Sequence, residues 1–183
     1  MVEKIYNEMK SQMDKTIAHY QSELSKIRTG RASVAMLDSV NVDYYGTMQP
    51  LKNIAHISVP ESQMIAITPF DPSSIEIIES AIVSSDLGMN PNNDGNVIRL
   101  SVPALTEERR IEITKHVHKI IEEGRVSVRN IRREVNDRIK KLKDDGLSED
   151  NIKRALDNVQ ETTDDSIKKL NTISELKEKE ILD

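Results

Sequence analysis

The sequence predicts an α+β protein in which an antiparallel bundle of three long helices carries a small inserted β/α/β domain. Three observations lead to this fold class. Apolar residues recur at helical spacing over residues 2–29, over residues 107–143 and again from residue 149 onward. Between the first two segments the pattern changes to short alternating apolar runs, which are typical of strands. Aromatic residues make up only 3% of the 183 residues, so the core must be built mainly from aliphatic side chains and methionine.

The first predicted helix spans residues 2–29. Its apolar face has heptad spacing and comprises Tyr6, Met13, Tyr20 and Ile27, with Met9, Ile17 and Leu24 beside them. Gly30 is the expected end, because glycine readily adopts the left-handed conformation that terminates helices.

Residues 31–103 are predicted to form the inserted domain. Strands are expected at residues 40–44, 54–59, 64–68 and 97–102, where β-branched residues and alternation dominate. A short helix that starts near Asp71-Pro72-Ser73 should bury Ile75, Ile78 and Ile82. Residues 88–95 are rich in glycine, asparagine and proline and are expected to form a loop.

The second long helix is predicted to begin after Thr106, its N-cap, and to continue to Lys143 without a proline. Ser148 should cap the third helix. Its predicted apolar face is Ile152, Leu156, Val159, Ile167, Leu170 and Ile173.

Each long helix is apolar on only one stripe, so the three must pack together into a bundle made of residues 1–30 and 104–183. Both connections to the inserted domain then lie at one end of this bundle, and two short linkers side by side favour a hinge between rigid bodies. The predicted hinge residues are Thr29, Gly30, Arg31, Pro103, Ala104, Leu105 and Thr106.

The charge distribution indicates a binding surface for nucleic acid. The net charge of the chain is −5, yet residues 107–143 contain twelve basic and seven acidic side chains. At 100° per residue, and with Arg125 at 0°, six cations of this helix share an arc of about 100°. We call them the cationic stripe: Arg125, Arg129, Arg132, Arg133, Lys140 and Lys143. Glu122 is the one acid in the arc, and the apolar residues Val117, Val128, Ile131, Val135, Ile139 and Leu142 lie on another face.

Two interpretations of the stripe remain open at this point. In the first, it is an ordinary solvated face whose arginines pair with acids of the third helix. In the second, it binds a phosphate backbone, because arginine makes bidentate phosphate contacts and the stripe extends over more than ~25 Å of helix.

Other functional classes find little support. There is no cysteine, the four histidines are scattered, and no phosphate-binding loop or hydrolase motif occurs, so we expect no metal, no cofactor and no enzymatic activity. A catalytic carboxylate pair, or a coiled-coil scaffold that binds protein partners, stays as an alternative. The chain has no apolar run of about 20 residues and no targeting segment. We therefore expect a soluble, cytoplasmic protein without membrane contact.

Five segments resemble bacterial ribosome recycling factors, and they occur in the order of that family. They are residues 24–33 (LSKIRTGRAS), 44–46 (YYG), 85–91 (SDLGMNP), 103–110 (PALTEERR) and 129–137 (RNIRREVND). One departure is Val135, where the family more often has alanine. This residue lies on the predicted bundle face, so the departure should affect packing and not RNA contact.

The resemblance implies an L-shaped molecule whose three-helix rod and β/α/β head meet at a flexible corner. It implies a factor that binds the post-termination ribosome, with its rod on large-subunit rRNA, and that splits the subunits together with elongation factor G and GTP. The arginines that the family uses on rRNA match Arg28, Arg31, Arg110, Arg129, Arg132 and Arg133 here, and Arg125 joins them from the cationic stripe.

Overall fold

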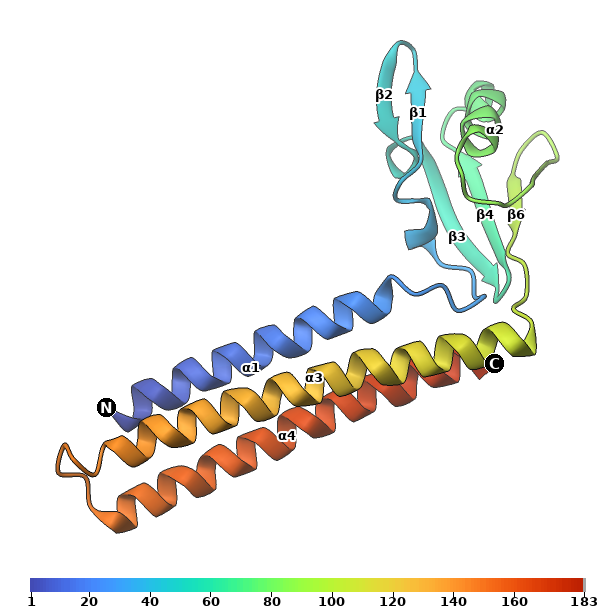
Figure 1. The fold of residues 1–183 in the computed structure, drawn as a ribbon. Helices are drawn as coiled ribbons and strands as arrows, with labels where there is room; N and C mark the ends of the chain where they lie inside the picture. Colours follow the sequence, from blue (N-terminus) through green and yellow to red (C-terminus); the bar gives the residue numbers. More distant parts are fainter. Residues whose placement is uncertain (183) are drawn as a thin grey trace. The chain divides into compact units, whose positions relative to one another are not determined.

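The computed structural model describes residues 1–182 and consists of two compact units. The first unit, here called the bundle, comprises Met1–Arg28 together with the chain from Glu107 onward. The second unit, here called the head, is Thr29–Thr106. The bundle is helical and the head contains the strands (Figure 1), so the predicted α+β class is confirmed.

Three long helices form the bundle: α1 (Val2–Ser25), α3 (Glu107–Lys141) and α4 (Glu149–Leu182). The helix α3 runs antiparallel to both of its neighbours (Figure 1). The prediction that the first helix continues to residue 29 is wrong. After Ser25 the backbone N–H groups of Lys26 and Ile27 donate to Glu23 and Leu24, three residues back, so the helix tightens and ends before Gly30.

The two other long helices begin where the sequence predicts. The helix α3 starts directly after Thr106 and has Glu107 and Glu108 in its first turn. Acidic side chains are stabilised there by the positive end of the helix dipole. It ends at Lys141, two residues before the predicted end at Lys143. The Ser148 hydroxyl accepts from the Asn151 backbone N–H at 3.4 Å and caps α4, as expected.

The bundle core lies between the apolar stripes of the three helices. Buried side chains of α1 include Met9, Met13 and Leu24, and those of α3 include Ile121 and Ile139. The apolar face predicted for α4 is only partly correct. Its buried residues are Ala155, Val159, Thr163, Ser166, Leu170, Ser174 and Ile181. The predicted members Ile152, Leu156, Ile167 and Ile173 are half-buried.

The difference in α4 has a local chemical reason. Buried hydroxyl groups remain satisfied because each can donate to a carbonyl within its own helix. The Thr163 hydroxyl donates to the Val159 carbonyl at 2.7 Å, and the Ser166 hydroxyl donates to the Thr162 carbonyl at 2.9 Å. Small hydroxyl residues can therefore take core positions that a pattern of large aliphatic residues does not identify.

The head is built on a four-stranded antiparallel sheet with the order β3-β4-β6-β5. Its strands are β3 (Ala55–Glu61), β4 (Met64–Pro69), β5 (Pro91–Asn93) and β6 (Ile98–Ser101). A separate hairpin pairs β1 (Asn41–Tyr44) with β2 (Thr47–Pro50). The helix α2 (Ile75–Ser84) buries Ile75, Ile78 and Ile82, as predicted, in the same core as Ile65 and Ile67 of β4.

Two strands of the head were not predicted. The expectation that residues 88–95 form only a loop is wrong, because Pro91–Asn93 pairs with β6 as an edge strand. The strand β2 was also not predicted. It follows a turn at Tyr45-Gly46, where the φ angles are 50° and 81°. Both strands lack the run of β-branched residues from which strands are usually identified.

Candidate nucleic-acid interface

The cationic stripe lies on the face of α3 that turns away from the bundle core. Arg133 and Lys140 are exposed, and Arg125, Arg129 and Arg132 are half-buried. The predicted core-facing residues Val117, Val128, Val135, Ile139 and Leu142 are all buried, and only Ile131 is half-buried. One helix thus separates an apolar face from a cationic face, as the helical wheel predicted.

Within residues 1–182, Glu122 is the one carboxylate that contacts any of the four arginines of the stripe, and it contacts two of them. Its two oxygens accept from Arg125 Nη1 at 2.9 Å and from Arg129 Nη1 at 3.1 Å. The hydrogen bond from Arg125, followed by that from Arg129, lowers the pKa of Glu122. A single carboxylate shared by two guanidinium groups cannot neutralise both, and at 51% side-chain exposure its attraction is weakened by solvent.

Two arginines of the stripe, Arg125 and Arg132, contact uncharged amide side chains of α4. Arg125 donates from Nε at 3.0 Å and from Nη2 at 2.6 Å to the single Oδ1 of Asn171. Arg132 Nη1 donates to Gln160 Oε1 at 3.3 Å, and Gln160 Nε2 in turn donates to Asp164 Oδ1 at 2.8 Å. These contacts hold the guanidinium groups in place without removing their positive charge.

The remaining cations of the stripe differ from one another. Arg133 and Lys140 make no hydrogen bond or ion pair within the described part of the chain. Lys143 lies beyond the end of α3 and pairs with Glu149 at 2.8 Å. Pairing with acids of the third helix, the first of the two open interpretations, therefore holds at Lys143 and not at the arginines.

This arrangement is suited to a phosphate backbone. Guanidinium groups with free N–H donors, spaced along a rigid helix, can contact successive phosphates. The distance from Arg125 to Arg133 along the axis is about 12 Å at 1.5 Å per residue, which is more than one small anion could span.

Arg110 has a different environment from the stripe. It lies 15 residues before Arg125 in the sequence, which is about 22 Å along α3. Its Nη1 donates at 3.1 Å to the backbone carbonyl of Leu182, at the end of α4. Its Nε is buried and has no partner within residues 1–182. Arg110 thus stabilises the carboxyl end of α4, where a cation is favoured by the helix dipole.

Two further arginines from the predicted site fall at the junction of the two units. Arg28 is exposed and is the last residue of the bundle before the head, and Arg31 is exposed and belongs to the head. Of the predicted hinge residues, Thr29, Gly30 and Thr106 lie next to the two boundaries between the units.

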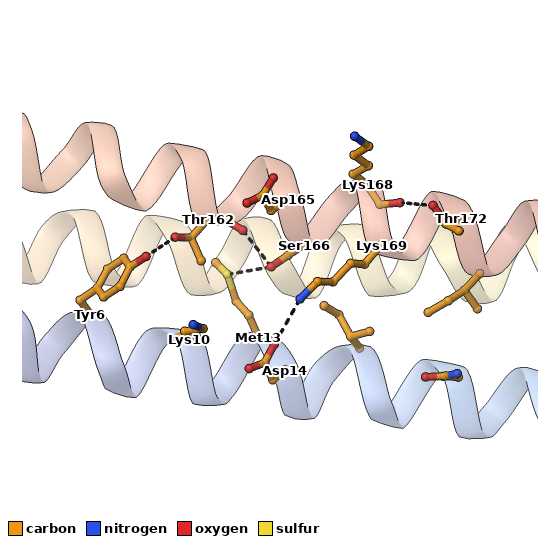
Figure 2. Close-up of a pocket in the computed structure, with 13 residues that line it drawn as sticks. Tyr6, Lys10, Met13, Asp14, Thr162, Asp165, Ser166, Lys168, Lys169 and Thr172 are labelled. Carbon is orange, nitrogen blue, oxygen red and sulfur yellow. Dashed lines mark hydrogen bonds and ion pairs between the residues drawn. The ribbon is translucent and has the colours of Figure 1, made fainter.

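The bundle also has a groove of about 650 Å³ between α1 and α4, and no residue of the stripe lines it (Figure 2). Tyr6 and Thr162 share a hydrogen bond of 2.7 Å across it. The Ser166 hydroxyl, which donates to the Thr162 carbonyl, also lies 3.5 Å from the Met13 sulfur. Lys169 Nζ lies 3.8 Å from Asp14 Oδ1, and Figure 2 marks this ion pair with a dashed line. Cations and acids alternate around this groove, so it offers no surface of one sign to a charged ligand.

The described residues contain no group of three or more histidine or acidic side chains that could hold a metal ion. Within the same residues, no helix is both long enough and apolar enough to cross a membrane.

Sequence reasoning missed Asn171 and Gln160. Nothing in the sequence of α4 marks one amide among many polar residues as the partner of an arginine. Only the packing of α3 against α4 shows which polar residues line the stripe.

Comparison with known proteins identifies the family. A family model described as ribosome recycling factor matches residues 20–182. The chain is 51% identical to the ribosome-recycling factor of Desulfatibacillum aliphaticivorans and 46% identical to that of Bacillus subtilis (strain 168), and each comparison covers 100% of both chains.

Two solved structures agree with this result. A solution structure of a ribosome recycling factor has a TM-score of 0.75 and 45% identity, and the match covers 99% of this chain and 97% of the other. A T. thermophilus ribosome recycling factor, in a model with E. coli elongation factor G on the E. coli post-termination complex, has a TM-score of 0.66 and 41% identity over 100% of both chains. The chain therefore belongs to the ribosome recycling factor family.

Proposed function

We propose that this protein binds the post-termination ribosome through large-subunit rRNA and that the cationic stripe supplies the main contact. The observation that carries the proposal is how little the four stripe arginines are neutralised. Arg125 and Arg129 share one carboxylate, Glu122, whereas Arg132 contacts only an amide and Arg133 faces solvent. A stripe in this state keeps most of its positive charge available for phosphate groups.

With elongation factor G and GTP, the bound factor would split the ribosomal subunits and so release mRNA and tRNA. This step follows from membership of the family and from the related factor that was placed with elongation factor G on a post-termination complex. GTP hydrolysis belongs to the elongation factor, so the protein acts as a binding factor without catalysing a reaction. Its site of action would be the cytoplasm.

The other predicted residues have separate roles in this proposal. Arg28, Arg31 and Arg110 would extend the rRNA contact toward the junction of the two units. Residues 29–31 and 103–106 would be the hinge that lets the head move while the bundle stays docked. Arg110 has one guanidinium nitrogen bonded to Leu182, so its contribution would come from its remaining donors.

The test is the binding of Arg132→Glu to purified large subunits by co-sedimentation over a range of salt concentrations. Arg132 has only one hydrogen bond, to a glutamine, so the variant should fold normally but bind roughly tenfold or more weakly. The salt slope of log Kd should fall by roughly one unit for each lost phosphate contact.

Arg154→Glu is the matched control. Arg154 is exposed on α4, makes no ion pair within residues 1–182, and the variant changes the charge by the same amount. Equal weakening by both variants would show that overall charge, and not the stripe, governs binding. Normal binding of Arg132→Glu would remove the stripe from the interface.

The alternative of a coiled-coil scaffold requires the arginines to pair with acids in a partner chain, and it predicts an oligomer. The binding factor should sediment as a monomer at equilibrium.

Subunit splitting, followed by light scattering with and without elongation factor G and GTP, would test the proposed activity itself.

A further inference from the structure

Two α4 amides line the cationic stripe at the positions where an acid would have formed an ion pair. Asn171 offers one oxygen to two nitrogens of Arg125, at 3.0 and 2.6 Å. Gln160 offers its oxygen to Arg132 at 3.3 Å. Carboxylates are common on this helix, and at both ends of the same seam they do contact basic side chains of α3 or of the turn after it. Glu178 lies 2.7 Å from His118, and Glu149 lies 2.8 Å from Lys143.

The choice of an amide has a clear electrostatic consequence. An amide oxygen accepts the same N–H groups as a carboxylate oxygen, but it carries no net charge. It can therefore fix the direction of a guanidinium group and leave the full positive charge for an outside anion. A carboxylate in the same place would compete with that anion for the arginine.

The contacts of Arg125 are sufficient to orient it. Nε and Nη2 define one edge of the planar guanidinium, and both point to Asn171 Oδ1. Nη1 points to Glu122 Oε2 at 2.9 Å. These three bonds use three of the five N–H donors, and two donors stay available. The Arg125 side chain is 28% exposed, so the free donors lie on a group that is otherwise held against the bundle.

Gln160 is itself oriented by a neighbour. Its Nε2 donates to Asp164 Oδ1 at 2.8 Å, so its oxygen is the atom that faces Arg132. The glutamine thus bridges Asp164 and Arg132, which form no direct ion pair with each other in the described residues.

We propose that Asn171 and Gln160 are positioning residues that direct Arg125 and Arg132 toward rRNA phosphates while preserving their charge. This inference rests on the proposed function, because it assumes that the stripe docks on rRNA. It adds that the docking surface is made by two helices, and that α4 contributes to affinity through residues that need not touch the RNA.

The experiment is the substitution Asn171→Asp in the full-length protein, measured by co-sedimentation with large subunits over a salt series. The added carboxylate keeps the acceptor and strengthens the bond to Arg125, so the thermal unfolding midpoint should stay the same or rise. Binding should nevertheless weaken by roughly tenfold at low salt, and the salt slope should fall by roughly one unit. A purely structural role for Asn171 predicts no loss of binding from a variant that is equally stable or more stable.

Three companion variants make the result specific. Asn158→Asp adds the same charge to an exposed asparagine about 140° away around the same helix, and it should bind nearly as the wild type does. Gln160→Glu repeats the test at Arg132 and should also weaken binding. Glu122→Gln removes the one carboxylate from the arginines and should strengthen binding and steepen the salt slope.

The possible outcomes separate this inference from the proposed function. If Arg125→Ala and Arg132→Glu both bind normally, the stripe does not contact rRNA and the proposed function fails. If those variants bind weakly but Asn171→Asp and Gln160→Glu bind normally, only the positioning inference is overturned. Equal weakening by Asn158→Asp and Asn171→Asp also overturns it, because the effect would then be general repulsion.

Discussion

Gly30 is held in the left-handed region of backbone conformation, with φ of 77°. A Cβ atom at this position would lie 3.0 Å from Leu105 Cγ and 3.5 Å from the Leu105 backbone nitrogen. The two linker segments that bound the head therefore pass each other closely at this point. Glycine serves both needs, since it accepts positive φ without strain and leaves room for the second linker.

We predict that Gly30→Ala lowers the free energy of unfolding of the head by more than the ~1 kcal/mol expected from positive φ alone. The additional loss comes from the contact with Leu105. The matched variant is Gly95→Ala, where φ is 93° but no atom lies within 4 Å of the new Cβ, so only the conformational term applies. Urea unfolding of both variants measures the two effects.

A second substitution checks the role of Leu105. Trimming this side chain in the double variant Gly30→Ala, Leu105→Ala should recover part of the extra loss, because the clash is with its Cγ. If Gly30→Ala and Gly95→Ala are equally destabilised, the close approach of the two linkers contributes nothing.

At the level of single residues, the sequence identified the charged members of the site better than their partners. A helical wheel needs only the position along one helix, so it placed Arg125, Arg129 and Arg132 on one face. The positions of Asn171 and Gln160 depend on how α4 packs against α3, which no single-helix pattern contains. Likewise, the sequence placed Glu122 within the arc but did not reveal that it binds two arginines at once.

At the level of elements, helices were predicted more accurately than short strands. The start of α3 was correct because capping and acidic first-turn residues are local signals. β5 and β2 have three and four residues, and each is formed only because a partner strand lies beside it. Strand pairing of this kind is a tertiary property, and it overrides weak local preference.

The turn between β5 and β6 is stabilised by one side chain. Asp94 Oδ2 accepts from Arg99 Nη1 at 2.6 Å, and Oδ1 accepts from the backbone N–H groups of Asn96 and Val97 at 2.9 and 2.8 Å. The bond from Arg99, with those two backbone bonds, lowers the pKa of Asp94 from 3.8 to about 2. The ionised carboxylate is therefore favoured by the folded hairpin.

The sign of the resulting pH dependence follows from linkage. Because the folded pKa is below the unfolded one, Asp94 stabilises the head fully above about pH 4, and this stabilisation is lost as the pH falls through about 2. We predict that Asp94→Asn is less stable than the wild type at pH 7 and that the difference shrinks between pH 4 and pH 2. Urea unfolding at a series of pH values measures that difference.

Asp86→Asn provides the control for the pH series. Asp86 is exposed in the same unit, and its side chain makes no hydrogen bond or ion pair within residues 1–182. Its stability should follow that of the wild type across the series. A constant gap between Asp94→Asn and the wild type down to pH 2 would contradict the assignment of the stabilisation to the ionised carboxylate.

At the level of the whole molecule, charge and core are both divided between the two units. The head, residues 29–106, contains three basic and eight acidic side chains, whereas α3 carries the cationic stripe. Repulsion between an acidic head and RNA would disfavour docking in the wrong orientation, so the stripe would select how the factor binds. The apolar core of the head is drawn entirely from residues 32–102, so it does not depend on bundle side chains.

Because the head and the bundle have separate apolar cores, we expect the two units to unfold independently of each other. Ile65 in the head and Ile121 in the bundle are both fully buried, and replacing either with valine removes one carbon atom and should cost roughly 0.5–1.5 kcal/mol. We predict that Ile65→Val lowers the hydrogen-exchange protection of β3, β4 and β6 by that amount and leaves α1, α3 and α4 unchanged. Ile121→Val should do the reverse.

Native-state hydrogen exchange resolves the two units within one experiment, and each variant serves as the control for the other. Equal loss of protection in both units from either variant would mean that the chain unfolds as one cooperative body. A hinge at residues 29–31 and 103–106 requires the opposite result, because a head can move as a rigid body on a docked bundle only if each unit keeps its own fold during the movement.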